Sequence, residues 1–150
     1  MYLKIMINQN LIFLDFRLLD KNDEWKKEVK NYFLQFKEID NISDSDVINL
    51  VRDLKIDIAV DLKGFTTNNR SSIFSNRIAP IQINYLGYPG TTAIQNMDYI
   101  IADELIIPKK NFRHFSEKVV HLPNCYQPNM HKREISNKKL TRNEFGLPDN

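Results

Sequence analysis

Cysteine is nearly absent from this sequence, which limits how the fold can be stabilised. Cys125 is the single cysteine among 150 residues, so the chain cannot form an internal disulfide. A lone thiol fits a reducing compartment, and we expect a cytoplasmic protein in which Cys125 is packed or incidental. Long apolar runs are also absent: none approaches the roughly 20 residues of a membrane-spanning helix, so no membrane partner is expected. Residues 1–12 have no small-residue cleavage site, which argues against a signal peptide.

An excess of charge of either sign is lacking as well. Lys and Arg number 21 and Asp and Glu number 19, which gives a net charge of +2. Because no dense basic cluster departs from this balance, nucleic acid is not expected as a partner. The three histidines, His114, His121 and His131, match no zinc-binding spacing, so no metal site is expected.

The sequence does contain alternating helical and strand patterns, with a hydrophobic content of 42% that suffices for a core. The length fits one domain, or one lobe of a larger protein. Short apolar runs predict strands at residues 11–16, 56–62, 81–85, 97–102 and 118–122, and residues 2–7 form a further candidate without a clear register. Helical spacing predicts helices at 23–36 and 43–54, and short helices at 71–77, 108–115 and 141–146. This alternation is typical of an α/β fold with parallel strands.

The predicted helix at residues 43–54 has the clearest start signal. Ser43 can cap its amino end, and Asp46 lies in the first turn, where the helix dipole favours negative charge. The helix at residues 23–36 has a stripe of aromatic residues, which we interpret as a core-facing surface without a ligand role.

Residues 86–91 form the first of two loops that are candidates for a ligand site. Gly87 and Gly90 permit positive φ or close backbone approach, and Pro89 fixes one φ between them. The loop follows a predicted strand, and open α/β sheets bind ligands at the carboxyl ends of their strands. An ordinary strand and turn is the alternative interpretation.

Residues 63–70 form the second candidate loop, after the strand at 56–62. Gly64 gives room for a ligand or a tight turn, and Arg70 can clamp an anionic or carbonyl group through two hydrogen bonds. A surface arginine in a polar loop is the alternative for Arg70.

Asp98 and Asp103, at the two ends of a predicted strand, also allow two interpretations. Two carboxylic acids can divide the roles of general acid and general base. We favour the other interpretation, in which Asp98 starts a strand and Asp103 caps a helix or forms a turn.

A series of short motifs runs along the same part of the chain: DLKGFT at 61–66, YLGYPGT at 85–91, DYIIAD at 98–103, SEKVV at 116–120 and YQPN at 126–129. In this order they resemble the catalytic region of the protein O-GlcNAc transferase and SPINDLY-type family. The resemblance is firm over residues 56–129 and weaker over 11–54, and residues 1–10 match nothing in the family. Several motifs in register are more specific than one glycine loop.

This resemblance implies the GT-B architecture, in which two Rossmann-like lobes face each other across a cleft. Residues 1–130 would be part of the N-terminal, acceptor-side lobe, and 131–150 a linker to the second lobe. The implied reaction is direct displacement without a metal, which transfers a sugar to a protein Ser or Thr hydroxyl. The expected donor is UDP-GlcNAc, held mainly by the second lobe, although SPINDLY-type members use GDP-fucose and other relatives glucosylate asparagine.

Carried over motif by motif, the resemblance implies two groups of substrate-binding residues. Leu86, Gly87 and Pro89 would line the site of the transferred sugar, with Tyr88, Gly90 and Thr91 as further candidates in the same loop. The acceptor side would comprise Gly64, Phe65, Thr66 and Arg70. Many relatives have a basic residue where this chain has Thr67, which leaves acceptor binding at that position open. No catalytic residue is implied, because none of the three histidines lies where the family has its His-Pro motif.

We therefore expect a first-lobe segment that is truncated at both ends and inactive by itself. Its implied partners are an acceptor protein or peptide, a nucleotide sugar, and a second lobe that another chain could supply. Two other functions remain open. The chain could be a non-catalytic lobe that binds peptides, or a decayed gene fragment without an activity of its own.

Overall fold

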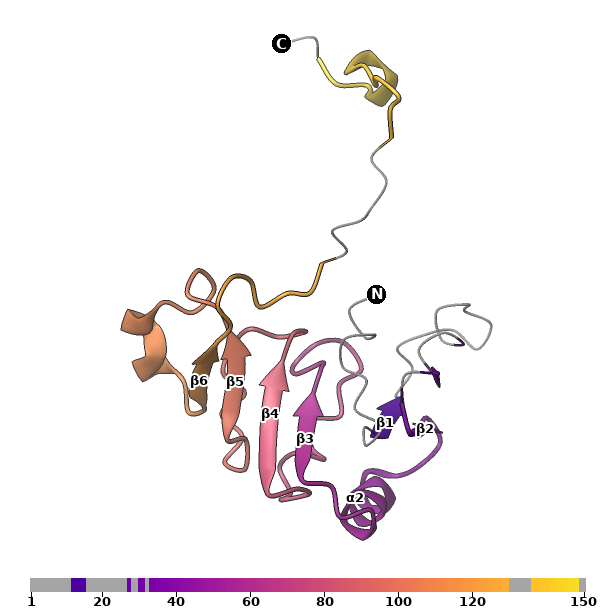
Figure 1. The fold of residues 1–150 in the computed structure, drawn as a ribbon, viewed down its shortest axis with the longest axis vertical. Helices are drawn as coiled ribbons and strands as arrows, with labels where there is room; N and C mark the ends of the chain where they lie inside the picture. The colour runs from indigo at the N-terminus through magenta and orange to yellow at the C-terminus, as the bar shows by residue number, and fades with distance from the viewer. Residues whose placement is uncertain (1–11, 16–26, 28–29, 32, 130–135, 149–150) are drawn as a thin grey trace.

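A four-stranded parallel sheet is the largest element of the structure, a computed structural model that describes residues 12–15, 27, 30–31, 33–129 and 136–148. Its strands are β3 (Ile58–Asp61), β4 (Ile81–Tyr85), β5 (Tyr99–Ala102) and β6 (Lys118–His121). They lie side by side in the order of the sequence (Figure 1). All three pairings are parallel, which confirms the predicted α/β class and the four strands assigned to this region.

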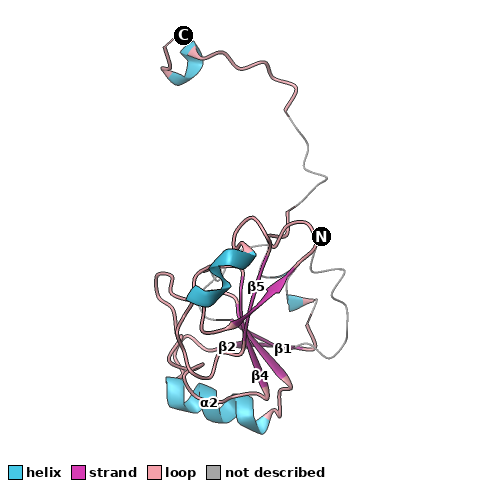
Figure 2. Cartoon of the chain, turned by 90° about the vertical axis from the view of Figure 1, so that its left-hand side faces the viewer, coloured by secondary structure: helices cyan, strands magenta, loops and turns pink. Residues whose placement is uncertain are grey.

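The sequential strand order accounts for a sheet with one covered face and one open face. Right-handed crossovers between strands that advance in one direction all pass over the same face. On that face the register aligns Ala59 with Gln82, and both are buried. On the other face Ile58 is 51% exposed and Val60 is 42% exposed. Figure 2 shows the helices of residues 44–53 and 109–114 on one side of the strands.

Helix α2 (Asp44–Asp53) supplies most of the covering layer over β3. The predicted cap is confirmed, because the Ser43 side chain accepts a hydrogen bond from the Asp46 amide at 3.2 Å. Three buried side chains, Val47, Ile48 and Val51, belong to the same core cluster as Ala59. Within the described residues, no helix is long and apolar enough to span a membrane.

A second, two-stranded sheet corrects the helix predicted at residues 23–36. Gln35 and Phe36 belong to strand β2 (Gln35–Glu38), which pairs in parallel with β1 (Ile12–Asp15). The conformation of Gln35 and Phe36 is determined by pairing with β1. The spacing of apolar residues along 23–36 does not reveal this pairing. Most of residues 23–34, and the candidate strand at 2–7, lie outside the described residues.

The short elements follow the predictions with one exception. A 3-10 helix, η2 (Lys109–His114), follows Pro108, and a second, η3 (Asn143–Phe145), ends at Gly146 with a φ of 65°. Residues 71–75 form consecutive turns instead of the predicted helix at 71–77, with hydrogen bonds such as Phe74 N to Ser71 O that span three residues. Side-chain amides bind the carbonyl groups at the end of these turns, because Gln82 donates to Phe74 O at 2.9 Å and Asn96 donates to Ser75 O at 2.7 Å.

Candidate functional site

The two candidate loops, residues 63–70 and 86–91, lie against each other at the carboxyl ends of β3 and β4. A β-carbon added to Gly87 would lie 2.5 Å from the Leu62 carbonyl oxygen and 2.9 Å from that of Lys63. These distances are too short for any side chain, and both oxygens belong to the backbone, which cannot move aside locally. The close backbone approach predicted for Gly87 is therefore confirmed, and the partner is the other loop.

Aromatic rings extend this contact toward the surface. The rings of Phe65 and Tyr88 are 5.7 Å apart at their centroids and tilted by 56°. Phe65 is 47% exposed, so one face of the pair is available to a ligand. Thr66 is turned into its own loop, since its hydroxyl donates to Lys63 O at 3.2 Å. An aromatic surface at a sheet edge suits a peptide or the apolar face of a sugar ring.

Two buried polar side chains at the strand ends hold the loops, and sequence reasoning did not single them out. Asp61 accepts hydrogen bonds from the Lys63 amide at 2.9 Å and the Gly64 amide at 3.0 Å. Asn84, its partner in the register, donates to Tyr88 O at 3.0 Å and Gly90 O at 3.2 Å. A polar residue at the end of the otherwise apolar β3 was the available signal for Asp61.

Leu86 has a φ of 78°, in the left-handed region that residues other than glycine rarely adopt. Such a conformation costs on the order of 1–3 kcal/mol and persists only where the surroundings impose it. Here the Asn84 amide and the contact of Gly87 with the loop at 63–70 impose it. The loop at 86–91 is thus fixed, and its backbone is strained at the point where it leaves β4.

The segment at residues 124–129 lies beside the ends of β4 and β5 and forms the third part of the site. The Tyr85 hydroxyl donates to Tyr126 O at 2.7 Å, and the Tyr126 amide donates to the Asp103 carboxylate at 2.8 Å. Burial raises the pKa of the Tyr85 hydroxyl, so it stays protonated and remains a donor at neutral pH. Cys125, predicted to be packed or incidental, is exposed.

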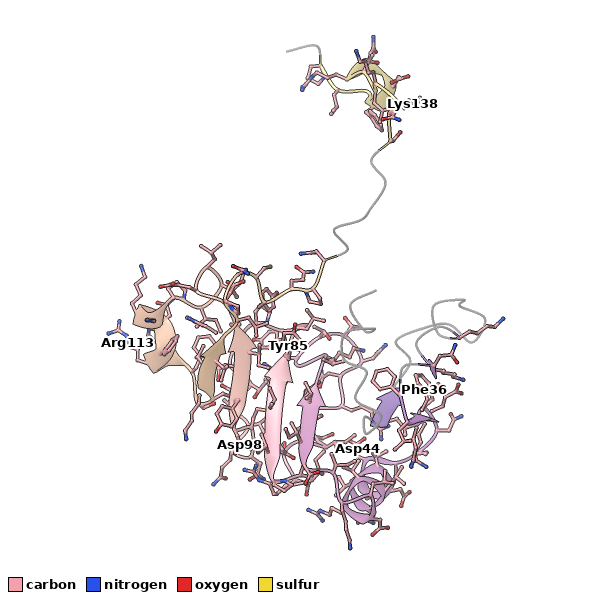
Figure 3. All side chains as sticks on the ribbon, in the orientation of Figure 1. Phe36, Asp44, Tyr85, Asp98, Arg113 and Lys138 are labelled. Atoms are coloured by element: carbon pink, nitrogen blue, oxygen red, sulfur yellow. The ribbon has the colours of Figure 1, made fainter. Side chains whose placement is uncertain are left out.

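Asp98 and Asp103 do not meet, because they flank opposite ends of β5. Figure 3 shows Asp98 at the end of the sheet away from Tyr85. There it pairs with Arg77, whereas the Asp103 carboxylate accepts hydrogen bonds from the Leu105 and Ile106 amides. The interpretation of Asp103 as a turn former is confirmed, and the two carboxylates cannot share a reaction centre.

Comparison with known proteins identifies the family. The sequence model of glycosyl transferase family 41 matches residues 10–143. The chain belongs to this family. A probable UDP-N-acetylglucosamine–peptide N-acetylglucosaminyltransferase, SEC of Arabidopsis thaliana, is 35% identical over 133 residues, which are 85% of this chain and 14% of the relative. A SPINDLY protein of Oryza sativa subsp. japonica is 40% identical over 96 residues, 62% of this chain and 10% of the relative.

A solved structure supports the fold of this family 41 chain. A mutant O-GlcNAc transferase from Thermobaculum terrenum matches with a TM-score of 0.73 and 25% identity, over 78% of this chain and 22% of that one. The predicted resemblance is confirmed, and the chain has the Rossmann-like, parallel-sheet fold of a GT-B lobe. It spans a small share of the relatives it matches, and the substrate roles of the two loops stay predictions.

Arg70 of this family 41 chain contacts three residues of the protein itself. Its guanidinium forms a 2.5 Å ion pair with Asp44 and donates to Ile39 O at 2.9 Å and Ile42 O at 2.7 Å. Hydrogen bonds from Ser72 and Arg70 hold the pKa of the Asp44 carboxyl below its ordinary value, although burial opposes them. These contacts join the loop at 63–70 to the start of α2, and the role of Arg70 in substrate binding stays a prediction.

The described residues also contain no group of three or more His, Cys, Asp or Glu side chains that could hold a metal ion. The site therefore consists of two loops locked by glycines, an exposed aromatic pair and the Tyr126 segment. Its functional groups are backbone amides and carbonyls, hydroxyls and rings, which suit binding and orientation.

Proposed function

We propose that this chain supplies the acceptor-side wall of a protein O-linked glycosyltransferase. In the assembled enzyme the loop at 86–91 faces the transferred sugar, and the loop at 63–70 faces the acceptor peptide. The donor we favour is UDP-GlcNAc, because the names of the relatives specify UDP-N-acetylglucosamine–peptide transfer. Residues 1–130 act as one lobe, and 131–150 lead toward the nucleotide-binding lobe.

The observation that carries this proposal is the locked contact between the two loops. Gly87 touches the backbone of residues 62 and 63, and Gly64 touches Tyr88, so neither loop can shift without the other. A sugar held by one loop and a hydroxyl presented by the other would therefore keep a fixed separation. Such positioning can contribute roughly 7–11 kcal/mol of the barrier reduction in a two-substrate reaction.

The first experiment tests peptide binding to the isotopically labelled chain by NMR. Titration with a Ser/Thr-rich peptide is expected to shift the amides of residues 64–66 and 86–91, and a peptide with Ala in place of Ser and Thr is expected to bind more weakly. Phe65→Ala should reduce the affinity, whereas Phe145→Ala, which removes another exposed ring, should not. Shifts confined to other parts of the sheet would contradict the assignment of the loops.

The second experiment tests whether the 150 residues transfer sugar without a donor-binding lobe. The 133 residues that align with the Arabidopsis thaliana relative are 14% of its length, so most of the donor contacts are expected from elsewhere. Radiolabelled UDP-GlcNAc should give no product above that of a Gly87→Trp variant. Turnover above this control would contradict the proposal that the donor is bound mainly by another lobe. Peptide binding without turnover, with or without a second lobe, would favour a non-catalytic binding lobe.

A further inference from the structure

Glu117 is a buried carboxylate that the proposed function does not use. It directly precedes β6 and is 4% exposed. The groups that donate to it are neutral: the Thr91 hydroxyl at 2.6 Å, the Thr92 hydroxyl at 2.6 Å, the Thr92 amide at 2.7 Å and the Ser116 hydroxyl at 3.1 Å. Burying a carboxylate costs free energy, and four short hydrogen bonds compensate for it here. A carboxylate bound this closely indicates that the segment it contacts must be held in one conformation.

The segment that Glu117 holds is the end of the loop at 86–91. Thr91 is the last residue of this loop, and Thr92 begins the return toward β5. Thr91 contacts one carboxylate oxygen of Glu117 and Thr92 contacts the other, so two consecutive residues are fixed by one side chain. The hydrogen bonds outweigh the effect of burial and keep the pKa of the Glu117 carboxyl below its ordinary value.

Backbone strain shows why two fixed points are needed. Leu86 has a φ of 78° at the start of the segment, and Ala93 has a φ of 52° directly after Thr92. Neither residue is glycine, so each conformation is unfavourable unless neighbouring contacts impose it. Asn84 holds the segment from β4 through Tyr88 O and Gly90 O. Glu117 holds the opposite end.

We propose that Glu117 is a positioning residue for the sugar-facing loop: from the start of β6, and through Thr91 and Thr92, it sets the course of the strained segment between Leu86 and Ala93. It is not a catalytic residue, because its carboxylate is enclosed by threonine and serine donors. The relevance to sugar transfer rests on the proposed function, but the control of the loop does not.

The test compares Glu117→Gln with Glu104→Gln, which removes a charge from an exposed glutamate after β5. In Glu117→Gln the amide hydrogen of Thr92 should exchange at least tenfold faster, and the NMR signals of residues 86–93 should shift, while amides of β3 keep their protection. Glu104→Gln should change neither. Unaltered exchange and unaltered loop signals in Glu117→Gln would overturn the proposal.

A second variant covers the case in which Glu117→Gln does not fold. Thr92→Val keeps the shape of the side chain and the amide donor but removes the hydroxyl bond to Glu117. It should accelerate exchange in the same segment by a smaller factor, and normal exchange would overturn the proposal. Peptide titration of both variants separates the two hypotheses. If the parent chain binds no peptide, the proposed function fails, while the exchange data still decide the role of Glu117.

Discussion

A β-carbon added to Gly64 would lie 2.6 Å from the Cβ atom of Tyr88, so these two residues join the loops after β3 and β4 by direct contact. Gly64 also has a φ of 55°, which a side chain tolerates poorly. The contact therefore depends on glycine for two separate reasons, steric and conformational. Gly146 has a similar φ of 65° but nothing within 4 Å of an added β-carbon, so it isolates the conformational reason.

Gly64→Ala is expected to destabilise the fold by about 2–4 kcal/mol, because overpacking adds to left-handed strain. Gly146→Ala should cost about 1 kcal/mol, the strain alone, in its own turn. Urea unfolding followed by circular dichroism measures the difference. Equal midpoints for the two variants would show that the loops are not in tight contact.

Asn84→Asp is expected to destabilise the fold by about 3 kcal/mol or more, because a carboxylate would face the carbonyl oxygens of Tyr88 and Gly90. Gln82→Glu is the matched control, since the Gln82 amide group donates to two carbonyl oxygens away from the loops. Both should unfold at lower urea concentration, but Asn84→Asp alone should shift the NMR signals of residues 86–91. Loop signals shifted equally by both variants would contradict a specific role for Asn84.

Arg70→Lys is expected to lose about 1.5–3 kcal/mol of stability, because lysine keeps the charge but cannot reach Asp44, Ile39 O and Ile42 O together. Arg113→Lys, at an exposed position in η2, should have almost no effect. Thermal or urea unfolding distinguishes the two roles of Arg70. Unchanged stability together with weaker ligand binding would support the interpretation of Arg70 as a ligand clamp.

The pH dependence of stability should contain a contribution from Asp98. Hydrogen bonding to Arg77 is the main cause that holds the pKa of the Asp98 carboxyl below its ordinary value. The folded state therefore binds this proton less readily than the unfolded state. The pair stabilises the fold above about pH 4, and the contribution is lost as the pH falls through the folded pKa.

Because the Arg77–Asp98 pair is partly exposed, with side chains 41% and 30% accessible, its contribution should stay below about 1 kcal/mol. Asp98→Asn should therefore lower the urea midpoint at neutral pH and have less effect at pH 3. Glu104→Gln serves as the control. An Asp98→Asn profile parallel to that of the parent chain would exclude the contribution.

The sequence was sufficient to predict those elements whose structure depends on neighbouring residues in the chain. Ser43 and Asp46 predict the start of α2, because the cap and its partner are three residues apart. Gly64 and Gly87 identify the two loops, because glycine beside a strand end is visible in sequence. The four residues of β2 were missed, since only pairing with the distant β1 stabilises them.

Alternation within β4 points to the wrong face of the sheet. Ile81 is apolar but 37% exposed, whereas Gln82 and Asn84 are polar and fully buried. The burial of these amides depends on carbonyl groups outside β4: Asn84 donates to Tyr88 O and Gly90 O in the loop that follows, and Gln82 donates to Phe74 O and Asn96 O. The role of Glu117 is hidden for the same reason, because Thr92 lies 25 residues earlier.

The 25 residues between Thr92 and Glu117 affect the order in which a newly made chain acquires its structure. Strands β3, β4 and β5 can associate as they leave the ribosome, since β4 pairs with β3 and β5 pairs with β4. The segment from Leu86 to Ala93 is synthesised well before Glu117, and it lacks its second fixed point until β6 arrives. The loop at 86–91 thus becomes fully fixed only after the strands beneath it have formed.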